Sequence, residues 1–121
     1  MATTAFVLEP DPVERSWIAS ALAPLVETVV FVSSPAALLS LQLSERDCLV
    51  ACAEPDASAV LELVRELRLR GSRLPAIMFG SHTAFRTAVE LARMEATDFL
   101  ERPFSARQLR DAVHRTRAAG R

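Results

Sequence analysis

Two cysteines are the first side chains of this sequence that could do chemistry. Cys48 and Cys52 lie four residues apart in a short apolar run, where an extended strand would place them on one face about 13 Å apart. A disulfide needs Cα atoms within about 7 Å, so these thiols cannot bridge each other. Two thiols are also too few for a structural zinc site. Cys52 could act alone as a redox-sensitive thiol, but a lone cysteine in a buried strand is more often an apolar filler.

Two aspartates stand where a carboxylate could cap a helix or do chemistry. Asp11 precedes Pro12, and Glu14 follows three residues after Asp11, which is typical of a helix N-terminus closed by a capping carboxylate. Asp56 stands in the same way before the segment 57–70, whose apolar residues form one helical stripe. Capping is therefore the favoured interpretation of both aspartates.

Composition limits the classes of partner. The 121 residues suffice for one ordinary domain. With 14 basic and 15 acidic residues the formal net charge is −1, which predicts no affinity for nucleic acid or membranes from bulk charge. All 14 basic residues are arginine, so lysine chemistry is excluded. No signal peptide is recognisable and no apolar run approaches the ~20 residues of a spanning helix, so we expect a cytoplasmic protein.

Apolar runs alternate with helical patterns five times. The runs cover residues 5–9, 28–32, 48–53, 75–79 and 97–100, and they are typical of strands that helices cover on both faces. This alternation predicts a doubly wound α/β domain with a five-stranded parallel sheet and five helices. We expect one domain over residues 1–121, of which residues 117–121 could begin a linker.

The intervening segments carry signals for helix ends. Ser34-Pro35 should begin a helix over "AALLSLQL", and Gly71 should end the helix that Asp56 begins. In the segment 83–94, the spacing predicts that Phe85, Ala88, Val89 and Ala92 face inward. Ser105 and Gln108 form a capping box before the last helix, with Phe104 and Leu109 as its hydrophobic staple.

Residues 74–104, "LPAIMFGSHTAFRTAVELARMEATDFLERPF", carry a specific family pattern. This stretch resembles the receiver domain of bacterial two-component response regulators, with an acidic-aromatic-leucine segment followed by Arg-Pro-Phe where the family has Lys-Pro-Phe. The segment "FVLEPDPVER" resembles the first strand of a receiver domain and its acidic turn, and "CLVACA" resembles the third strand. The resemblance therefore covers essentially the whole chain. It implies a flavodoxin-like fold with the strand order 2-1-3-4-5.

The resemblance also implies a phosphorylation site, from which this sequence departs. Such receivers take a phosphoryl group from a histidine kinase onto an aspartate, with Mg²⁺ held by two acidic residues and with a Thr or Ser and a lysine reading the phosphoryl oxygens. The corresponding positions here are Glu9 and Pro10 for the acidic pair, Cys52 for the nucleophile, Gly80 for the hydroxyl and Arg102 for the lysine. A thiolate is a poor ligand for Mg²⁺. We therefore expect weak or no Mg²⁺ binding and no other cofactor.

These departures predict a pseudo-receiver that is not an enzyme. It would act without phosphorylation, through contacts with a protein partner or an output domain, and regulate an output such as transcription. Two alternatives remain open. One is phosphorylation on a substitute carboxylate, with Asp56 or Asp11 as the first candidates and Glu54 as a further one. The other is a thiol switch at Cys52.

A surface for pairing is also implied by the resemblance, on the fourth helix, fifth strand and fifth helix. It would present charges of both signs, namely Arg86, Glu90, Arg93, Asp98, Arg107, Arg110 and Asp111. Such a pattern suits a two-fold homodimer, although it also suits an ordinary wet surface. The basic residues of the last helix are interrupted by Asp111, so we expect no direct nucleic-acid binding.

Overall fold

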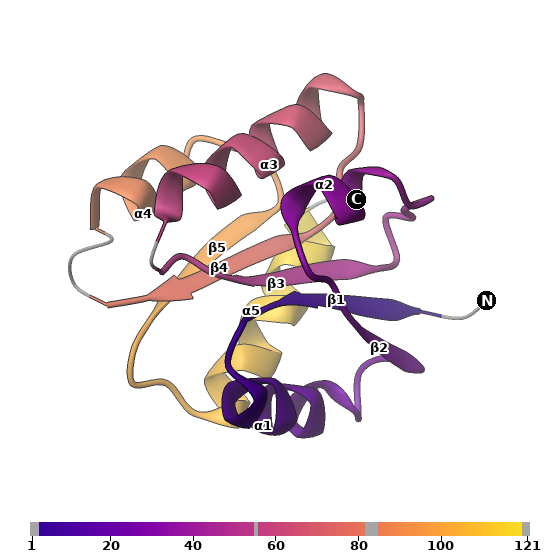
Figure 1. The fold of residues 1–121 in the computed structure, drawn as a ribbon, viewed down its shortest axis with the longest axis vertical. Coiled ribbons are helices and arrows are strands. Elements are labelled where there is room, and N and C mark those ends of the chain that lie inside the picture. Colours follow the sequence, from indigo (N-terminus) through magenta and orange to yellow (C-terminus); the bar gives the residue numbers. More distant parts are fainter. Residues whose placement is uncertain (1–2, 55, 82–84, 120–121) are drawn as a thin grey trace.

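In the described residues, five parallel strands form one sheet, as the sequence pattern predicts, in the order β2-β1-β3-β4-β5 that the resemblance implies (Figure 1). The computed structural model describes residues 3–54, 56–81 and 85–119. The strands are β1 (Thr4–Leu8), β2 (Thr28–Phe31), β3 (Cys48–Cys52), β4 (Ala76–Gly80) and β5 (Thr97–Glu101). This is the flavodoxin-like arrangement that the resemblance implies.

Helices cover both faces of this sheet. They are α1 (Pro12–Leu22), α2 (Pro35–Leu39), α3 (Ala57–Leu69), α4 (Phe85–Leu91) and α5 (Ala106–Ala119). Figure 1 shows α2, α3 and α4 on one face and α1 and α5 on the other. In the described part of the chain, no helix is long and apolar enough to cross a membrane.

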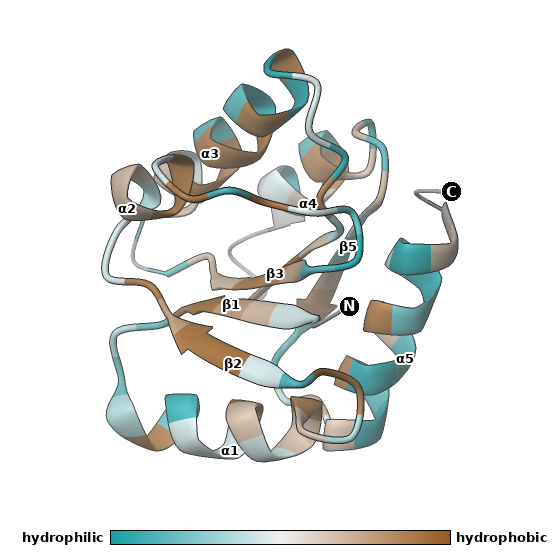
Figure 2. Cartoon of the chain, turned by 90° about the vertical axis from the view of Figure 1, so that its right-hand side faces the viewer, coloured by the Kyte–Doolittle hydropathy of each residue, from teal (hydrophilic) through white to brown (hydrophobic). Residues whose placement is uncertain are grey.

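The core consists of two apolar layers, one on each face of the sheet. Every residue of β3 and β4 is buried, because these strands are covered on both faces. Leu49 and Ala51 pack in the layer of α3, whereas Cys48, Val50 and Cys52 pack in the layer of α1 and α5. Figure 2 shows hydrophobic colour along β1 and β2, and both colours around α3 and α5, as expected for helices with one buried face.

Helix ends follow the predicted signals. The Ser34 hydroxyl accepts a hydrogen bond from the Ala37 N–H at 3.1 Å. Gly71 follows Arg70, the C-cap residue of α3, and adopts a φ of +84°, a conformation that favours glycine. Ser105 and Gln108 exchange hydrogen bonds of 2.7 and 3.1 Å, which confirms the capping box.

Two helices are shorter than predicted. α2 ends at Leu39, so residues 40–43 of the predicted helix lie outside it. α4 ends at Leu91, which places Ala92 beyond the helix. The predicted inward face of α4 is wrong at Val89, which is 42% exposed, and at Ala92, which is also exposed, whereas Leu91 is buried. Two residues apart on a helix lie about 200° apart, so Leu91 facing the sheet turns Val89 to solvent. Residues 83 and 84 of this predicted helix lie outside the described residues.

The last helix extends through residues 117–119, part of the segment 117–121 in which the sequence allows a linker to begin. Arg117 donates hydrogen bonds to the carbonyls of Leu25 and Arg46, at 3.3 and 3.0 Å. The end of α5 is therefore fastened to two neighbouring loops. Residues 120 and 121 lie outside the described residues.

Candidate functional site

The carboxyl ends of four strands bring the predicted site residues to one edge of the sheet. Leu8 pairs with Ala51, so Glu9 follows β1 at the level of Cys52. Gly80 ends β4, and its carbonyl accepts a hydrogen bond from the Arg102 N–H at 2.8 Å. Glu9, Cys52, Gly80 and Arg102 therefore meet there, although they are distant in sequence.

Arg102 occupies the centre of this edge, between three carboxylates. Its guanidinium nitrogens lie 3.1 Å from Glu14 Oε2, 3.7 Å from Glu54 Oε1 and 3.9 Å from Glu9 Oε2. The Cys52 Sγ accepts a hydrogen bond from Arg102 Nη2 at 3.7 Å. We call these five residues the Arg102 cluster. It contains three acidic groups and one guanidinium, so a cation already occupies the space that the carboxylates share.

The guanidinium is also held by packing. The Arg102 Cζ lies 5.0 Å from the centroid of the Phe79 ring, a cation–π contact. Partial burial lowers the pKa of Arg102, but hydrogen bonds to Cys52 and Glu14 outweigh this and raise it. Arg102 therefore stays charged at every physiological pH.

Glu9 is the buried carboxylate of the cluster, with only 4% of its surface exposed. One oxygen accepts a hydrogen bond from the Asp11 N–H at 3.0 Å. The other, Oε2, is buried and has no hydrogen-bond partner among the described residues. The backbone carbonyl of Glu9 accepts a hydrogen bond from Arg15 Nε at 2.5 Å. Glu9 thus depends on Arg102, 3.9 Å away, to balance its charge.

Cys52 presents a thiol rather than a thiolate. Burial raises its pKa above the ordinary value of 9.0, and the neighbouring Glu9 carboxylate raises it too. The Glu54 N–H, which donates to Sγ at 3.4 Å, and the Arg102 guanidinium lower the pKa by less. The neutral thiol therefore dominates at pH 7, which makes Cys52 a weak nucleophile and a poor metal ligand.

The two aspartates near this edge cap helices, as predicted. Asp11 Oδ1 accepts a hydrogen bond from the Val13 N–H at 2.9 Å. Asp56 Oδ1 accepts hydrogen bonds from the Ser58 hydroxyl at 2.6 Å and the Ser58 N–H at 3.1 Å. The bond from the Ser58 hydroxyl is the main reason why the pKa of Asp56 is lowered. Both carboxylates are thus engaged at helix N-termini.

Glu14 has a different role from the one predicted. The sequence assigns it to the capping box of α1, but its carboxylate accepts a hydrogen bond from Trp17 Nε1 at 2.9 Å and pairs with Arg102. The Asp11 N–H that it would have satisfied is bonded to Glu9 instead. The wrong assignment arose because the Ser/Asp-x-x-Glu spacing says nothing about a distant arginine.

Two hollows flank the Arg102 cluster. A cavity of about 310 Å³ is lined by Glu9, Arg15, Cys52 and apolar side chains of β1 and α3, among others. A second, of about 300 Å³, lies between Arg102 and the aromatic rings of Trp17 and Phe104. Within the described ranges no group of three or more His, Cys, Asp or Glu side chains could hold a metal ion.

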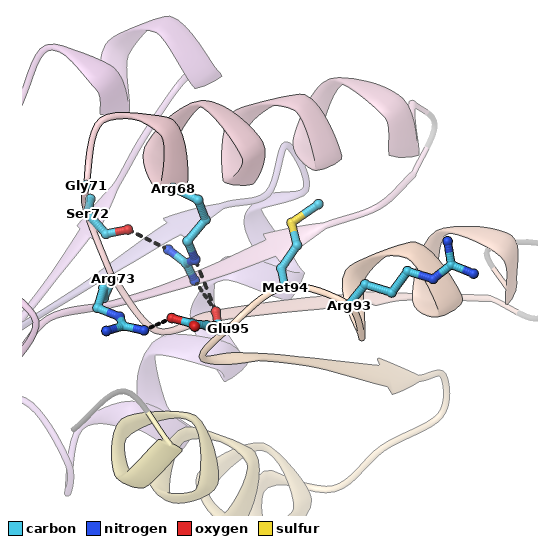
Figure 3. Close-up of a pocket in the computed structure, with 7 residues that line it drawn as sticks. All are labelled: Arg68, Gly71, Ser72, Arg73, Arg93, Met94 and Glu95. Carbon is cyan, nitrogen blue, oxygen red and sulfur yellow. Dashed lines mark hydrogen bonds and ion pairs between the residues drawn. The ribbon is translucent and has the colours of Figure 1, made fainter.

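A third pocket, of about 480 Å³, lies at the other end of β4 and is structural (Figure 3). Arg68 donates hydrogen bonds to the carbonyls of Ser72, Leu74 and Glu95, at 3.1, 2.9 and 2.8 Å. Arg73 forms an ion pair with the Glu95 carboxylate. Burial lowers the pKa of Arg68, as does the charge of Arg73 to a smaller extent. These contacts fasten the loop between α3 and β4.

Part of the predicted pairing surface is used within the chain. Glu90 pairs with Arg65 of α3 at 2.9 Å, and Asp98 pairs with Arg115 at 2.7 Å. Arg110 points toward α1, where its Nη1 lies 3.5 Å from the Ala21 carbonyl oxygen. Arg110 thus lies on α5, but this contact turns its guanidinium toward α1. The exposed residues of the predicted set are Arg86, Glu90, Arg93, Arg107 and Asp111.

Comparison with known proteins gives one relative by sequence. No protein-family model matches the chain. The chain is 32% identical over 99 residues to the transcriptional regulatory protein FixJ of Azorhizobium caulinodans. The match covers 81% of this chain and 47% of FixJ, so the chain spans about half the length of that relative.

Solved structures of response regulators are also similar to this chain, over nearly its whole length. FixJ-N is 25% identical with a TM-score of 0.78, over 98% of this chain and 94% of FixJ-N. A response regulator receiver protein from Sinorhizobium medicae superposes with a TM-score of 0.80 at 22% identity, over 99% of this chain and 98% of that one. By its strand order and its likeness to FixJ and FixJ-N, this chain resembles response-regulator receiver domains in fold and in sequence.

Proposed function

We propose that this receiver works without phosphorylation and transmits its signal through protein–protein contacts. The observation that carries the proposal is Cys52, a neutral and nearly buried thiol at the end of β3. The resemblance places the nucleophilic aspartate at this position. A protonated thiol offers neither the oxygen nucleophile nor the hard ligand that a Mg²⁺-assisted transfer requires.

The remaining carboxylates do not rebuild a metal site. One oxygen of the Glu9 carboxylate accepts a hydrogen bond from the Asp11 N–H. Pro10 stands at the position of the second acidic residue and has no carboxylate. Arg102 already lies among the carboxylates, so a dication would have to displace it. We therefore propose that the domain binds Mg²⁺ weakly or not at all, uses no other cofactor and is not an enzyme.

The output is proposed from the relative. FixJ is a transcriptional regulatory protein of which this chain covers about half, so we propose a protein partner or an attached output domain that acts on transcription. We further propose a cytoplasmic location and a homodimer through the surface of α4, β5 and α5. Arg115 and Arg117 are engaged within the chain, which supports a helix α5 that does not bind nucleic acid itself.

The test is exposure to acetyl phosphate, or to beryllofluoride, with Mg²⁺. We expect no gain of a phosphoryl group in the intact mass and no shift of amide signals near Cys52 by NMR. A receiver of known phosphorylation, treated in parallel, is the positive control. One phosphoryl group on an acidic residue of this chain would overturn the proposal, and the variants Asp56→Asn and Asp11→Asn would then locate it.

A thiol switch at Cys52 is the second candidate function. The observation in its favour is that Arg102 Nη2 and the Glu54 N–H both point at Sγ, where they would stabilise a thiolate. The test is treatment with hydrogen peroxide, followed by measurement of the oligomeric state. Cys52→Ala should abolish any change that the oxidant causes, and the absence of such a change in the wild type excludes the switch.

A further inference from the structure

The Glu54 carboxylate bridges two loops at the edge of the sheet. Its Oε1 accepts a hydrogen bond from the Ser81 N–H at 3.0 Å, and Ser81 directly follows β4. The same oxygen lies 3.7 Å from Arg102 Nε, which directly follows β5. A backbone N–H and a guanidinium that converge on one oxygen form an anion-binding arrangement. The chain itself supplies the anion.

Cys52, at the position where the resemblance places the aspartate, helps to hold the backbone of Glu54. Its N–H donates a hydrogen bond to the Cys52 Sγ at 3.4 Å. Arg102 Nη2 donates to the same sulfur at 3.7 Å. The Cys52 sulfur therefore accepts hydrogen bonds from both Glu54 and Arg102. The thiol thus helps to position these two residues against each other.

We propose that Glu54 is a built-in oxyanion that permanently occupies the position between Arg102 and the Ser81 N–H. This inference rests on the proposed function, because it explains how the domain dispenses with a transferred phosphoryl group. The loops after β3, β4 and β5 are held together by Glu54 instead of by a ligand that comes and goes. The end of β4 is then fixed in one arrangement in the unmodified protein.

The decisive test is the backbone amide of Ser81, observed by NMR and by hydrogen exchange in three variants. Glu54→Ala removes the oxyanion, and Glu54→Gln keeps an oxygen acceptor without the charge. Glu62→Ala is the matched control, since Glu62 is an exposed glutamate that pairs with Arg65 on α3. We expect Ser81 to exchange about tenfold faster in Glu54→Ala, which corresponds to about 1.4 kcal/mol, and to be unchanged in Glu62→Ala.

Chemical rescue identifies the position as an anion site. Sodium acetate should return the Ser81 signal of Glu54→Ala toward its wild-type shift, whereas sodium chloride at equal ionic strength should not. Glu54→Gln should show an intermediate exchange rate that depends less on salt than that of the wild type.

Two results would overturn this inference. One is a Ser81 amide that does not respond to Glu54→Ala, or that responds equally to Glu62→Ala. The other is a failure of acetate to restore the signal. The proposed function fails separately, because only a phosphoryl group on the wild-type chain overturns it.

Discussion

Raising the pH from 8 to 11 should destabilise the folded domain through its buried thiols. Cys48 has no exposed surface, and burial raises its pKa from 9.0 to about 11, with a smaller opposing effect from Arg117. The folded thiol keeps its proton to a higher pH than the unfolded one. Its contribution to stability is therefore full below about pH 9 and is lost as the pH rises through 11. Each pKa unit corresponds to about 1.4 kcal/mol, so the loss from Cys48 is about 3 kcal/mol.

The composition isolates this effect. The sequence contains neither lysine nor tyrosine, the other side chains that ordinarily titrate between pH 9 and 11. Arginine stays protonated throughout this range. Cys52, whose pKa is also raised by burial, adds to the loss in the same direction. A fall in stability over this window thus reports on the two cysteines.

Urea unfolding under reducing conditions, followed by far-UV circular dichroism at pH 8, 9, 10 and 11, gives the free energy of unfolding. Cys48 alone should cost the wild type about 2 kcal/mol between pH 9 and 11, because about half of the folded thiol still keeps its proton at pH 11, and Cys52 should add to this loss. Cys48→Ala should lose much less, and the double variant Cys48→Ala/Cys52→Ala should show a flat profile. A flat profile for the wild type, or an equal loss in the double variant, would refute the reasoning.

Three further substitutions test the contacts that shape the domain by their effect on the free energy of unfolding. Arg102→Met should cost about 2 kcal/mol, because it leaves the buried Glu9 carboxylate with an unbalanced charge. The matched variant Arg65→Met breaks exposed ion pairs and should cost under about 0.5 kcal/mol. Equal costs for the two variants would contradict the role of Arg102. Asp56→Ala should destabilise α3 while Asp56→Asn, which keeps the capping oxygen, should not, and similar losses in both would argue against capping. Gly71→Ala should cost about 1 kcal/mol because the positive φ of this residue is unfavourable for alanine. A Cβ there meets no atom within 4 Å, so no steric clash adds to this conformational cost. An unchanged urea midpoint would exclude the cost.

The fold could be predicted because its signals are local and repeated. A strand covered on both faces is apolar along its whole length, so the run at 48–53 specifies a central strand without knowledge of its neighbours. Capping depends on contacts two or three residues away, which is why Asp11, Asp56 and the Ser105–Gln108 pair were assigned correctly. The prediction of the buried face of the short helix α4 was wrong, because a helix of few turns gives a weak periodic signal and Val89 is an exposed apolar residue.

The electrostatics of the site could not be predicted in the same way. The resemblance aligns Arg102 with the family's lysine, but it does not show which carboxylates surround it. Glu14 and Glu54 reach Arg102 from other loops, and only the folded backbone brings them within 4 Å. Asp47 was missed for a similar reason. Its buried carboxylate accepts a hydrogen bond from the Ser44 N–H, three residues away, and another from the Thr4 N–H, which is distant in sequence and which no local pattern encodes.

The substitutions at this edge depend on one another. Glu9 and Cys52 both lie within 4 Å of the same nitrogen, Arg102 Nη2. An aspartate in place of Cys52 would bring a further negative charge close to the buried Glu9 carboxylate, and like charges near one another repel. A dication would offset that repulsion, but Arg102 stands among the carboxylates that would bind it. The neutral thiol avoids the repulsion, which supports the proposal that Arg102, rather than a metal ion, balances the carboxylates at this edge.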